Sequence, residues 1–218
     1  MSVADGYSIR LPTEADAPAV AALITAADSD TGEVLSTGDV LDDWRRVDLE
    51  HDAWLATAPD GSAAGFLSLL ADEPLHVESD GYVHPAHVGR GLGSELIRLA
   101  EERAVLKGAG VVRNATLSTN RAAIALLESC GYRPARRYYR MVVDLREQPA
   151  EPEWPPGLRP EAYDPRQAEA FHAVHEEAFA DDTVAVSAGL GSAWTRRIRP
   201  VRCGSTSVPG CMSPSRPS

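Results

Sequence analysis

Three glycines at alternate positions, in the segment Val88-Gly-Arg-Gly-Leu-Gly-Ser94, restrict what this chain can fold into. The residues before them alternate like a β-strand, and those after them carry apolar side chains at helical spacing. Glycines in a strand-to-helix turn let backbone N–H groups approach an anion, and the positive end of the helix dipole adds attraction. The segment therefore predicts an α/β domain with a pyrophosphate-binding loop, although a plain connector can have the same glycines.

Two other phosphate-binding motifs do not fit this segment. A dinucleotide fingerprint requires G-x-G-x-x-G, but the sixth residue is Ser94 when counted from Gly89 and Leu96 when counted from Gly91. A P-loop requires Gly-Lys-Ser/Thr, which is absent from the segment. The spacing therefore excludes both motifs.

The first 145 residues alternate between strand and helix signals. Strands are expected at residues 7–11, 51–57, 63–70, 75–83, 111–117 and 138–145, and helices at 14–27, 39–48, 92–107 and 121–130. The turn Pro59-Asp60-Gly61 predicts a hairpin, and Gly81 indicates a bulge in its strand. Thr119 or Asn120 can cap the helix that begins at Arg121.

Composition narrows the classes of function. A net charge of −11 argues against a nucleic-acid partner, which requires a basic face, and weakly favours a cationic or amine substrate. No apolar run approaches the about 18 residues of a membrane span, and the first residues lack the pattern of a secretory signal. The three cysteines have no metal-type spacing, which suits a reducing compartment. We therefore expect a cytoplasmic protein with no nucleic-acid or membrane partner.

Two histidine pairs are candidate metal ligands. His84 and His87 lie in the turn that enters the glycine loop, with no third ligand nearby. His172 and His175 lack the H-E-x-x-H spacing. A structural role is favoured for both pairs, so we expect no metal site.

Two sequence blocks together resemble the GNAT acetyltransferases. Residues 83–96 are similar to their Q/R-x-x-G-x-G/A signature preceded by V-x-P. Residues 120–132 are similar to their N-x-x-A-x-x-L helix followed by G-F/Y, and the resemblance covers roughly residues 7–145. The first position of the signature, usually Gln or Arg, is Val88 here. This departure keeps open a non-catalytic acyl-CoA-binding module as the alternative to an active enzyme.

The resemblance implies a mixed α/β GNAT fold, in which helices flank a central, mostly antiparallel sheet with two splayed parallel strands. It implies acetyl-CoA as the acyl donor, no metal, and a small-molecule or peptide amine as the acceptor. The pantetheine arm would enter the gap between strands 75–83 and 111–117 near Tyr82 and Val83, and Asn120 would contact the arm. The pyrophosphate would lie on the backbone of seven residues: Val88, Gly89, Arg90, Gly91, Leu92, Gly93 and Ser94.

The chemistry that the resemblance implies is direct attack of an amine on the thioester, which needs a base, oxyanion donors and an acid. The family often places a glutamate base on the strand before the loop, where this chain has Glu78, with Asp80 on the same strand face. Glu78 could equally be a solvated strand residue. Many relatives carry, where this chain has Leu127, a tyrosine that acts as the general acid for the leaving thiolate. In this chain solvent can protonate the thiolate instead, because a thiolate is already stable near neutral pH. Three tyrosines are substitutes in principle: Tyr132, which is favoured as a core residue, Tyr138 and Tyr139.

The character of the chain changes after residue 145, which sets the first domain at 1–145. Residues 146–156 contain four prolines and predict a linker, and residues 157–181 resemble the opening strand and helix of a second GNAT domain, as in tandem-GNAT and mycothiol-synthase-like proteins. Of the 32 acidic residues only Asp182 lies in the last 37 residues, which follow no period. Residues 182–218 are therefore expected to be an aberrant tail from a reading-frame shift, with a natural disordered tail as the alternative.

Overall fold

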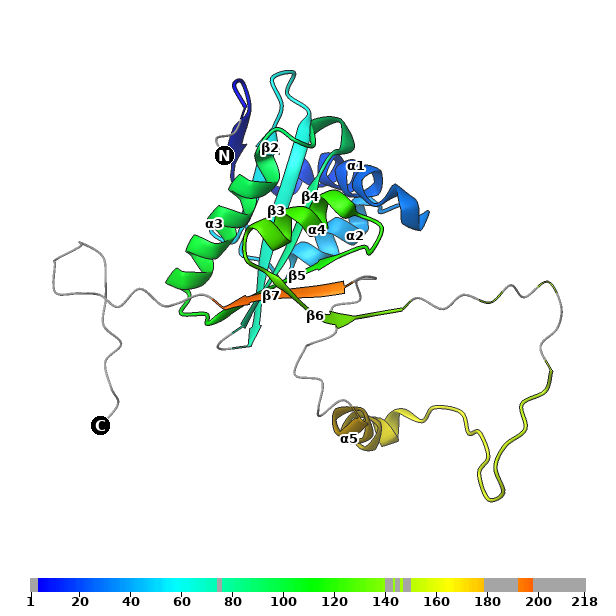
Figure 1. Cartoon of the computed structure of the whole chain (residues 1–218). Helices are drawn as coiled ribbons and strands as arrows, with labels where there is room; N and C mark the ends of the chain where they lie inside the picture. The colour runs from blue at the N-terminus through cyan, green and yellow to red at the C-terminus, as the bar shows by residue number, and fades with distance from the viewer. Residues whose placement is uncertain are drawn as a thin grey trace, which may run out of the picture.

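In the part of the chain that the structure describes, seven strands form one sheet. The computed structural model describes residues 4–73, 76–139, 143, 146, 150–178 and 192–197. The strands follow the order β1-β2-β3-β4-β5-β7-β6, with β4 and β5 parallel and the other neighbours antiparallel. Their bounds are β1 Ser8–Arg10, β2 Ala53–Thr57, β3 Ala63–Glu73, β4 His76–Val83, β5 Val111–Thr116, β6 Arg133–Arg137 and β7 Ser192–Arg197. The expected mixed fold, mostly antiparallel with one parallel pair, is confirmed (Figure 1).

Helices cover both faces of this sheet. They are α1 Ala17–Ala27, α2 Thr37–Trp44, α3 Leu92–Leu106 and α4 Arg121–Ser129. Helices α3 and α4 pack on one face, where they share a core with β3, β4, β5 and β7, and α1 and α2 pack on the other face (Figure 1). Because strand side chains alternate between the faces, Val77 belongs to the first core while Tyr82 packs against the second.

Local sequence signals determine where several elements begin. Ser36 and Asp39 form a capping box that starts α2, with the Ser36 Oγ accepting from the Asp39 N–H and the Asp39 carboxylate accepting from the Ser36 N–H. The Asn120 side chain caps α4 by accepting from the Ala123 N–H at 3.0 Å. Gly61, with φ of +87°, occupies the hairpin turn between β2 and β3.

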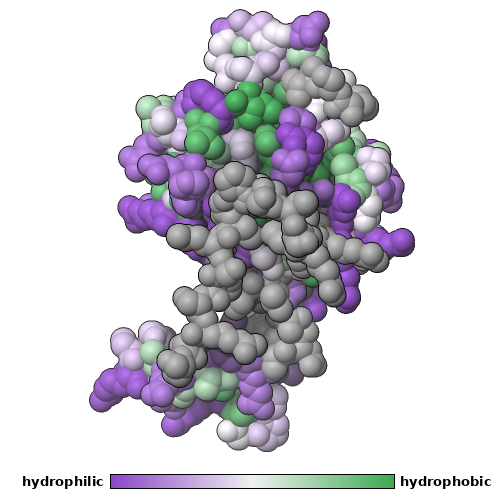
Figure 2. Space-filling view, turned by 90° about the vertical axis from the view of Figure 1, so that its left-hand side faces the viewer, coloured by the Kyte–Doolittle hydropathy of each residue, from purple (hydrophilic) through white to green (hydrophobic). Residues whose placement is uncertain are grey.

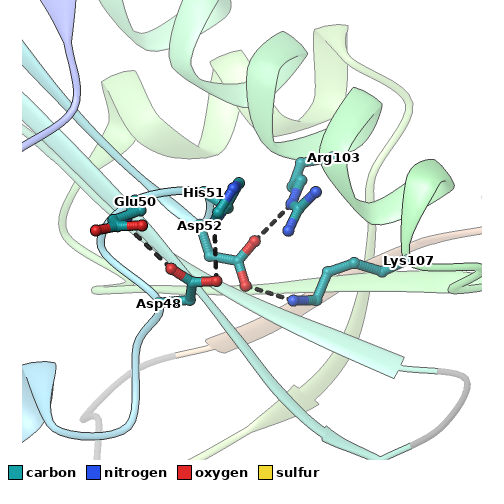
Figure 3. A network of polar contacts seen from close by, with 6 residues as sticks. All are labelled: Asp48, Glu50, His51, Asp52, Arg103 and Lys107. Carbon is teal, nitrogen blue, oxygen red and sulfur yellow. Dashed lines mark hydrogen bonds and ion pairs between the residues drawn. The ribbon is translucent and has the colours of Figure 1, made fainter. Parts of the chain in front are cut away.

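A buried carboxylate ties the end of α3 to the start of β2. Asp52 accepts from Arg103 Nε at 2.6 Å and from Lys107 Nζ, so that both cations converge on one carboxylate (Figure 3). Burial alone would raise the pKa of Asp52, but these hydrogen bonds and charges hold it below its usual value. The neighbouring Asp48 and His51 form a more exposed hydrogen bond at 3.0 Å.

The bulge expected at Gly81 is absent. Gly81 pairs regularly with Leu67, and the irregularity between β3 and β4 lies at Leu70 and Glu73 instead. A Cβ at Gly81 would meet the Leu67 side chain at 3.0 Å. The glycine therefore reflects close cross-strand packing, a long-range contact that the local pattern does not reveal.

The strand between β5 and β6 comes from the segment that was expected to be an aberrant tail. Strand β7 pairs with β5 along Val111–Thr116 and with β6, so its backbone is hydrogen-bonded on both sides. Trp194 is 5% exposed in the core, and Arg196 forms an ion pair with Glu101 of α3. For residues 192–197 the structure thus shows an inner strand of the sheet in place of the expected tail. Residues 198–218 lie outside the described residues.

Two other expectations for the second half are only partly met. Strand β6 ends at Arg137, so residues 138 and 139 are not part of a strand, and most of the remainder of the strand expected at 138–145 lies outside the described residues. Residues 157–160 form no strand, because no described strand lies beside them to complete a backbone ladder. The helix of this region is confirmed as α5, Ala168–Ala178.

Helix α5 lies away from the sheet (Figure 1). Its Phe171 and Val174 are 55% and 67% exposed, and Tyr163 makes an edge contact with Phe171 at 5.3 Å between ring centroids. Figure 2 shows hydrophobic surface on the lower lobe, at the level where Figure 1 draws α5. Among the described residues, no helix is both long and apolar enough to cross a membrane.

Candidate active site

The parallel strands β4 and β5 separate partway along their length. Their pairing runs from His76 with Val111 to Ser79 with Asn114, and it stops there although β4 continues to Val83 and β5 to Thr116. Strand β5 keeps its ladder to β7 through Thr116, so the separation lies on its β4 side. Beyond Ser79 the β5-facing backbone of β4 has no strand partner among the described residues, and a ligand that presents amide groups could pair with it.

The glycine loop follows directly from this free end of β4. Val88 is extended, and Gly89 and Gly91 both adopt the left-handed conformation with φ of +81°. Gly91 is the N-cap of α3 and supplies no side-chain hydrogen bond, so the first N–H groups of this 15-residue helix have no side-chain cap. A Cβ at Gly89 would meet nothing within 4 Å, so the loop leaves open space on that side. The segment 88–94 therefore leads into a helix start of the kind at which proteins bind anions.

Gly93 has a different role from the other two glycines of the loop. A Cβ at this position would lie 2.6 Å from Leu126 Cδ2, so the end of the Leu126 side chain would have to move. The third glycine thus permits α3 to begin against α4. Sequence reasoning grouped Gly93 with the anion-binding glycines because it could not see the helix that packs there.

The segment before β1 supports the same loop. The Tyr7 hydroxyl and His87 Nδ1 are hydrogen-bonded at 2.9 Å, and the Arg90 guanidinium lies over the Tyr7 ring at 5.9 Å from its centroid. The Ala4 N–H donates to the Arg90 carbonyl at 3.1 Å. These three contacts fix the loop from its outer side, and no local motif predicted them.

A second group of polar residues lies on the opposite face of β4, toward α1 and α2. Tyr82 donates from its hydroxyl to Asp80 Oδ2 at 3.2 Å. Asp80 keeps solvent-accessible surface, yet the protein around its carboxylate removes enough hydration to raise its pKa to about 6. The Tyr82 hydrogen bond opposes this rise, whereas the negative charges of Asp28, Glu78 and Asp43 add to it. Burial and Asp80 raise the pKa of Tyr82 well above its usual range, so its hydroxyl stays protonated.

The residues expected in the site fall into three groups. Loop residues 88–94, together with Tyr82 and Val83, lie along one continuous path from β4 to α3. Glu78 and Asp80 share the other face of β4, two residues apart. Leu127 and Tyr132 are buried in the α3–α4 core, so Tyr132 is a packing residue, and Tyr139 is exposed. Among the described residues, no group of three or more His, Cys, Asp and Glu side chains is placed to hold a metal ion.

Comparison with known proteins identifies relatives of this arrangement. The chain matches the family model described as the acetyltransferase (GNAT) family over residues 20–132, more than half of its length. A comparison with curated proteins gives no match.

Solved structures share both the fold and part of the sequence. A GCN5-related N-acetyltransferase from Sphaerobacter thermophilus is 34% identical with a TM-score of 0.73, and the match covers 82% of this chain but 60% of that one. The putative acetyltransferase yncA from Salmonella typhimurium, solved with its cofactor acetyl-CoA, is 26% identical with a TM-score of 0.53, over 61% and 83% of the two chains. A phosphinothricin acetyltransferase from Sinorhizobium meliloti, in complex with AcCoA, is 16% identical with a TM-score of 0.52, over 60% and 76%, and shows the fold alone.

Proposed function

Because this chain belongs to the GNAT acetyltransferase family, we propose that it is an N-acetyltransferase, which moves an acetyl group from acetyl-CoA to a primary amine by direct attack. The observation that carries the proposal is the meeting of three features at one end of β4. They are the separation of β4 from β5, the glycine loop that leads into α3, and Asp80 on the opposite strand face. The acceptor is a small molecule or a peptide.

The residues of the loop fit the acyl donor. The uncapped N–H groups at the start of α3 and the left-handed Gly89 and Gly91 suit a pyrophosphate, and Arg90 adds a positive charge beside it. Val88 removes a polar side chain from the signature but leaves the backbone donors in place. The β4 backbone at Tyr82 and Val83 would hold the pantetheine arm. Asn120 caps α4 with its side chain and would contact the arm from that position.

Two carboxylates of β4 are candidates for the base that accepts the amine proton. Glu78 is the residue that the family resemblance implies. Asp80 is favoured by its environment, because a pKa of about 6 leaves it ionised near neutral pH yet basic enough to accept a proton from an ammonium group. Tyr82 would orient the Asp80 carboxylate through its hydrogen bond. We therefore propose Asp80 as the base, with Glu78 as the alternative.

The charge around Asp80 supports an amine as the acceptor. Asp28 at the end of α1, Asp43 in α2 and Asp80 are close enough for each charge to raise the pKa of Asp80 or Tyr82. An amine reaches the protein as an ammonium ion at neutral pH, so this negative surface would attract it. The bound ammonium would in turn reduce the repulsion among the carboxylates.

Acetyl-CoA binding and turnover together test the proposal. We expect calorimetry to show binding of acetyl-CoA, and we expect a panel of primary amines to release free CoA faster than buffer alone. The alternative function, a non-catalytic acyl-CoA-binding module, is favoured by Val88 and by the core position of Leu127. Such a module would bind acetyl-CoA without turnover on any amine, and absence of binding would rule out both functions.

A further inference from the structure

Three polar side chains form a row across the sheet where β4 and β5 separate. Ser79 in β4 pairs with Asn114 in β5, and Asn114 pairs with Trp194 in β7. Directly paired residues of neighbouring strands project to the same face of a sheet. The face is the one covered by α3 and α4, because Val77, Val112 and Trp194 all belong to that core.

Each member of the row carries a buried polar atom without a partner. Ser79, Asn114 and Trp194 are 2%, 7% and 5% exposed. Ser79 Oγ, Asn114 Nδ2 and Trp194 Nε1 form no hydrogen bond with any part of the chain that the structure describes. Buried polar groups are almost always paired in folded proteins, so three neighbouring exceptions require an explanation.

The chemistry of the three atoms restricts what could pair with them. An amide nitrogen and an indole nitrogen can only donate hydrogen bonds, and a hydroxyl can donate as well. The two nitrogens cannot pair with each other, and the Ser79 hydroxyl, which can also accept, is paired with neither of them. A ligand that pairs with them must therefore present acceptors, such as the oxygen of a carbonyl or a carboxylate.

The row lies at the closed end of the gap that the proposed function assigns to the acyl donor. Ser79 and Asn114 form the last β4–β5 pair, so the gap begins immediately beyond them. Ser79 lies four residues, or about 13 Å at about 3.3 Å per residue, before the end of β4 at Val83. A donor held by its phosphates at the loop and extended along β4 would thus direct its acyl end toward the row.

We propose that Ser79, Asn114 and Trp194 form a donor row that binds an oxygen acceptor of the acyl donor. This inference rests on the proposed function, and it assigns the acyl end of the site to three residues, one of them from β7. The acceptor has two possible sources. It is either the thioester carbonyl, which every acyl-CoA carries, or an oxygen at the far end of the acyl group.

Binding measurements on the full chain test the donor row without a known acceptor amine. Calorimetry gives the dissociation constants of free CoA, acetyl-CoA, propionyl-CoA and succinyl-CoA for the wild type and for Ser79→Ala, Asn114→Leu and Trp194→Phe. We expect each variant to bind acyl-CoA about 5- to 100-fold more weakly, which is the cost of leaving one buried group unpaired. We expect its affinity for free CoA to be unchanged. Trp54→Phe, at a partly buried tryptophan beside the same core, is the matched control.

The pattern of loss distinguishes the two sources of the acceptor. Loss with all three acyl-CoAs identifies the thioester carbonyl, and loss with succinyl-CoA alone identifies the end of the acyl group. Thermal melting separates binding from packing, because removing an unpaired buried donor in Ser79→Ala or Asn114→Leu should leave the midpoint unchanged or raise it, whereas Trp194→Phe also removes packed volume and should lower it. Unchanged acyl-CoA affinities in folded variants would overturn the donor row alone, whereas a wild type that binds no CoA would overturn the proposed function and the donor row with it.

Discussion

At the scale of single residues, Asp80 shares one strand face with Glu78 and has an environment that favours its protonated form. The surrounding protein weakens the hydration of the Asp80 carboxylate, and three neighbouring acids repel its negative charge. Both effects favour the protonated form, which is why its pKa rises to about 6. The pH at which activity appears therefore tests whether Asp80 is the base.

If Asp80 is the base, the rate should depend on its ionisation. We expect kcat/KM to rise with pH and to level off above about pH 6, because only the carboxylate form accepts a proton. Asp80→Asn should lower turnover by about 10²- to 10⁴-fold and remove this limb of the pH profile. Glu78→Gln is the matched control and should keep most of the turnover and the limb, with the limb moved to lower pH because the charge of Glu78 no longer raises the pKa of Asp80. The reverse result in the two variants would assign the base to Glu78.

The loop offers a test of anion binding at Gly89, where the open space excludes a steric effect. Gly89→Asp and Gly89→Asn introduce side chains of equal size and similar backbone strain at a φ of +81°, but only Asp adds a negative charge. We expect Gly89→Asp to bind CoA about 10- to 100-fold more weakly than Gly89→Asn, because its charge repels the phosphates. Calorimetry at low salt measures the difference. Equal affinities for the two variants would mean that no phosphate lies near Gly89.

At the scale of elements, the segment that precedes β1 fixes the loop that precedes α3. Tyr7→Phe removes the hydrogen bond to His87 and keeps the ring beneath Arg90. We expect this variant to weaken CoA binding about 3- to 10-fold, the effect of one net hydrogen bond, with kcat unchanged. Tyr163→Phe, at an exposed tyrosine next to α5, is the control and should match the wild type. A fall in kcat with constant affinity would contradict a positioning role for Tyr7.

The Asp52 network joins two elements that are distant in sequence. Asp52→Asn leaves Arg103 and Lys107 without their shared carboxylate, and we expect it to lower the free energy of unfolding by about 2 to 3 kcal/mol at pH 7. This value is below that of a fully buried pair, because both cations keep contact with water. The pKa of Asp52 is lowered in the fold, so its stabilisation is present at neutral pH and is lost as the pH falls below about 4. Urea unfolding at pH 7 and at pH 3 should show the difference between wild type and variant shrinking at the lower pH.

At the scale of the whole molecule, the sheet is completed by a strand from far along the chain. Residues 138–191 separate β6 from β7, yet the two strands are neighbours. The long connection includes the proline-rich segment and α5, and neither completes a second domain within the described residues. The domain boundary proposed at residue 145 therefore needs revision, because 192–197 belong to the first sheet.

Two tryptophan substitutions test whether β7 is part of the fold. Trp194→Ala should lower the free energy of unfolding by about 3 to 5 kcal/mol, because it removes a large side chain from the core. Trp154, which is 53% exposed in the proline-rich segment, is the control, and Trp154→Ala should change stability by less than about 0.5 kcal/mol. Urea unfolding measures both. Equal stability of the two variants would support the aberrant tail that the composition predicts.

The sequence by itself determined the family resemblance, the glycine loop at 88–94 and most element bounds, because glycine spacing, capping residues and apolar period are local properties of the chain. The parallel pair was expected from that resemblance. Only the tertiary structure revealed that Gly93 packs against Leu126, that Asp80 has the perturbed pKa and that β7 fills the place beside β5. Each of these depends on atoms contributed by distant segments. Desolvation, close packing and a two-sided backbone ladder depend on neighbours in three dimensions. A local sequence pattern does not specify which distant residues these neighbours are.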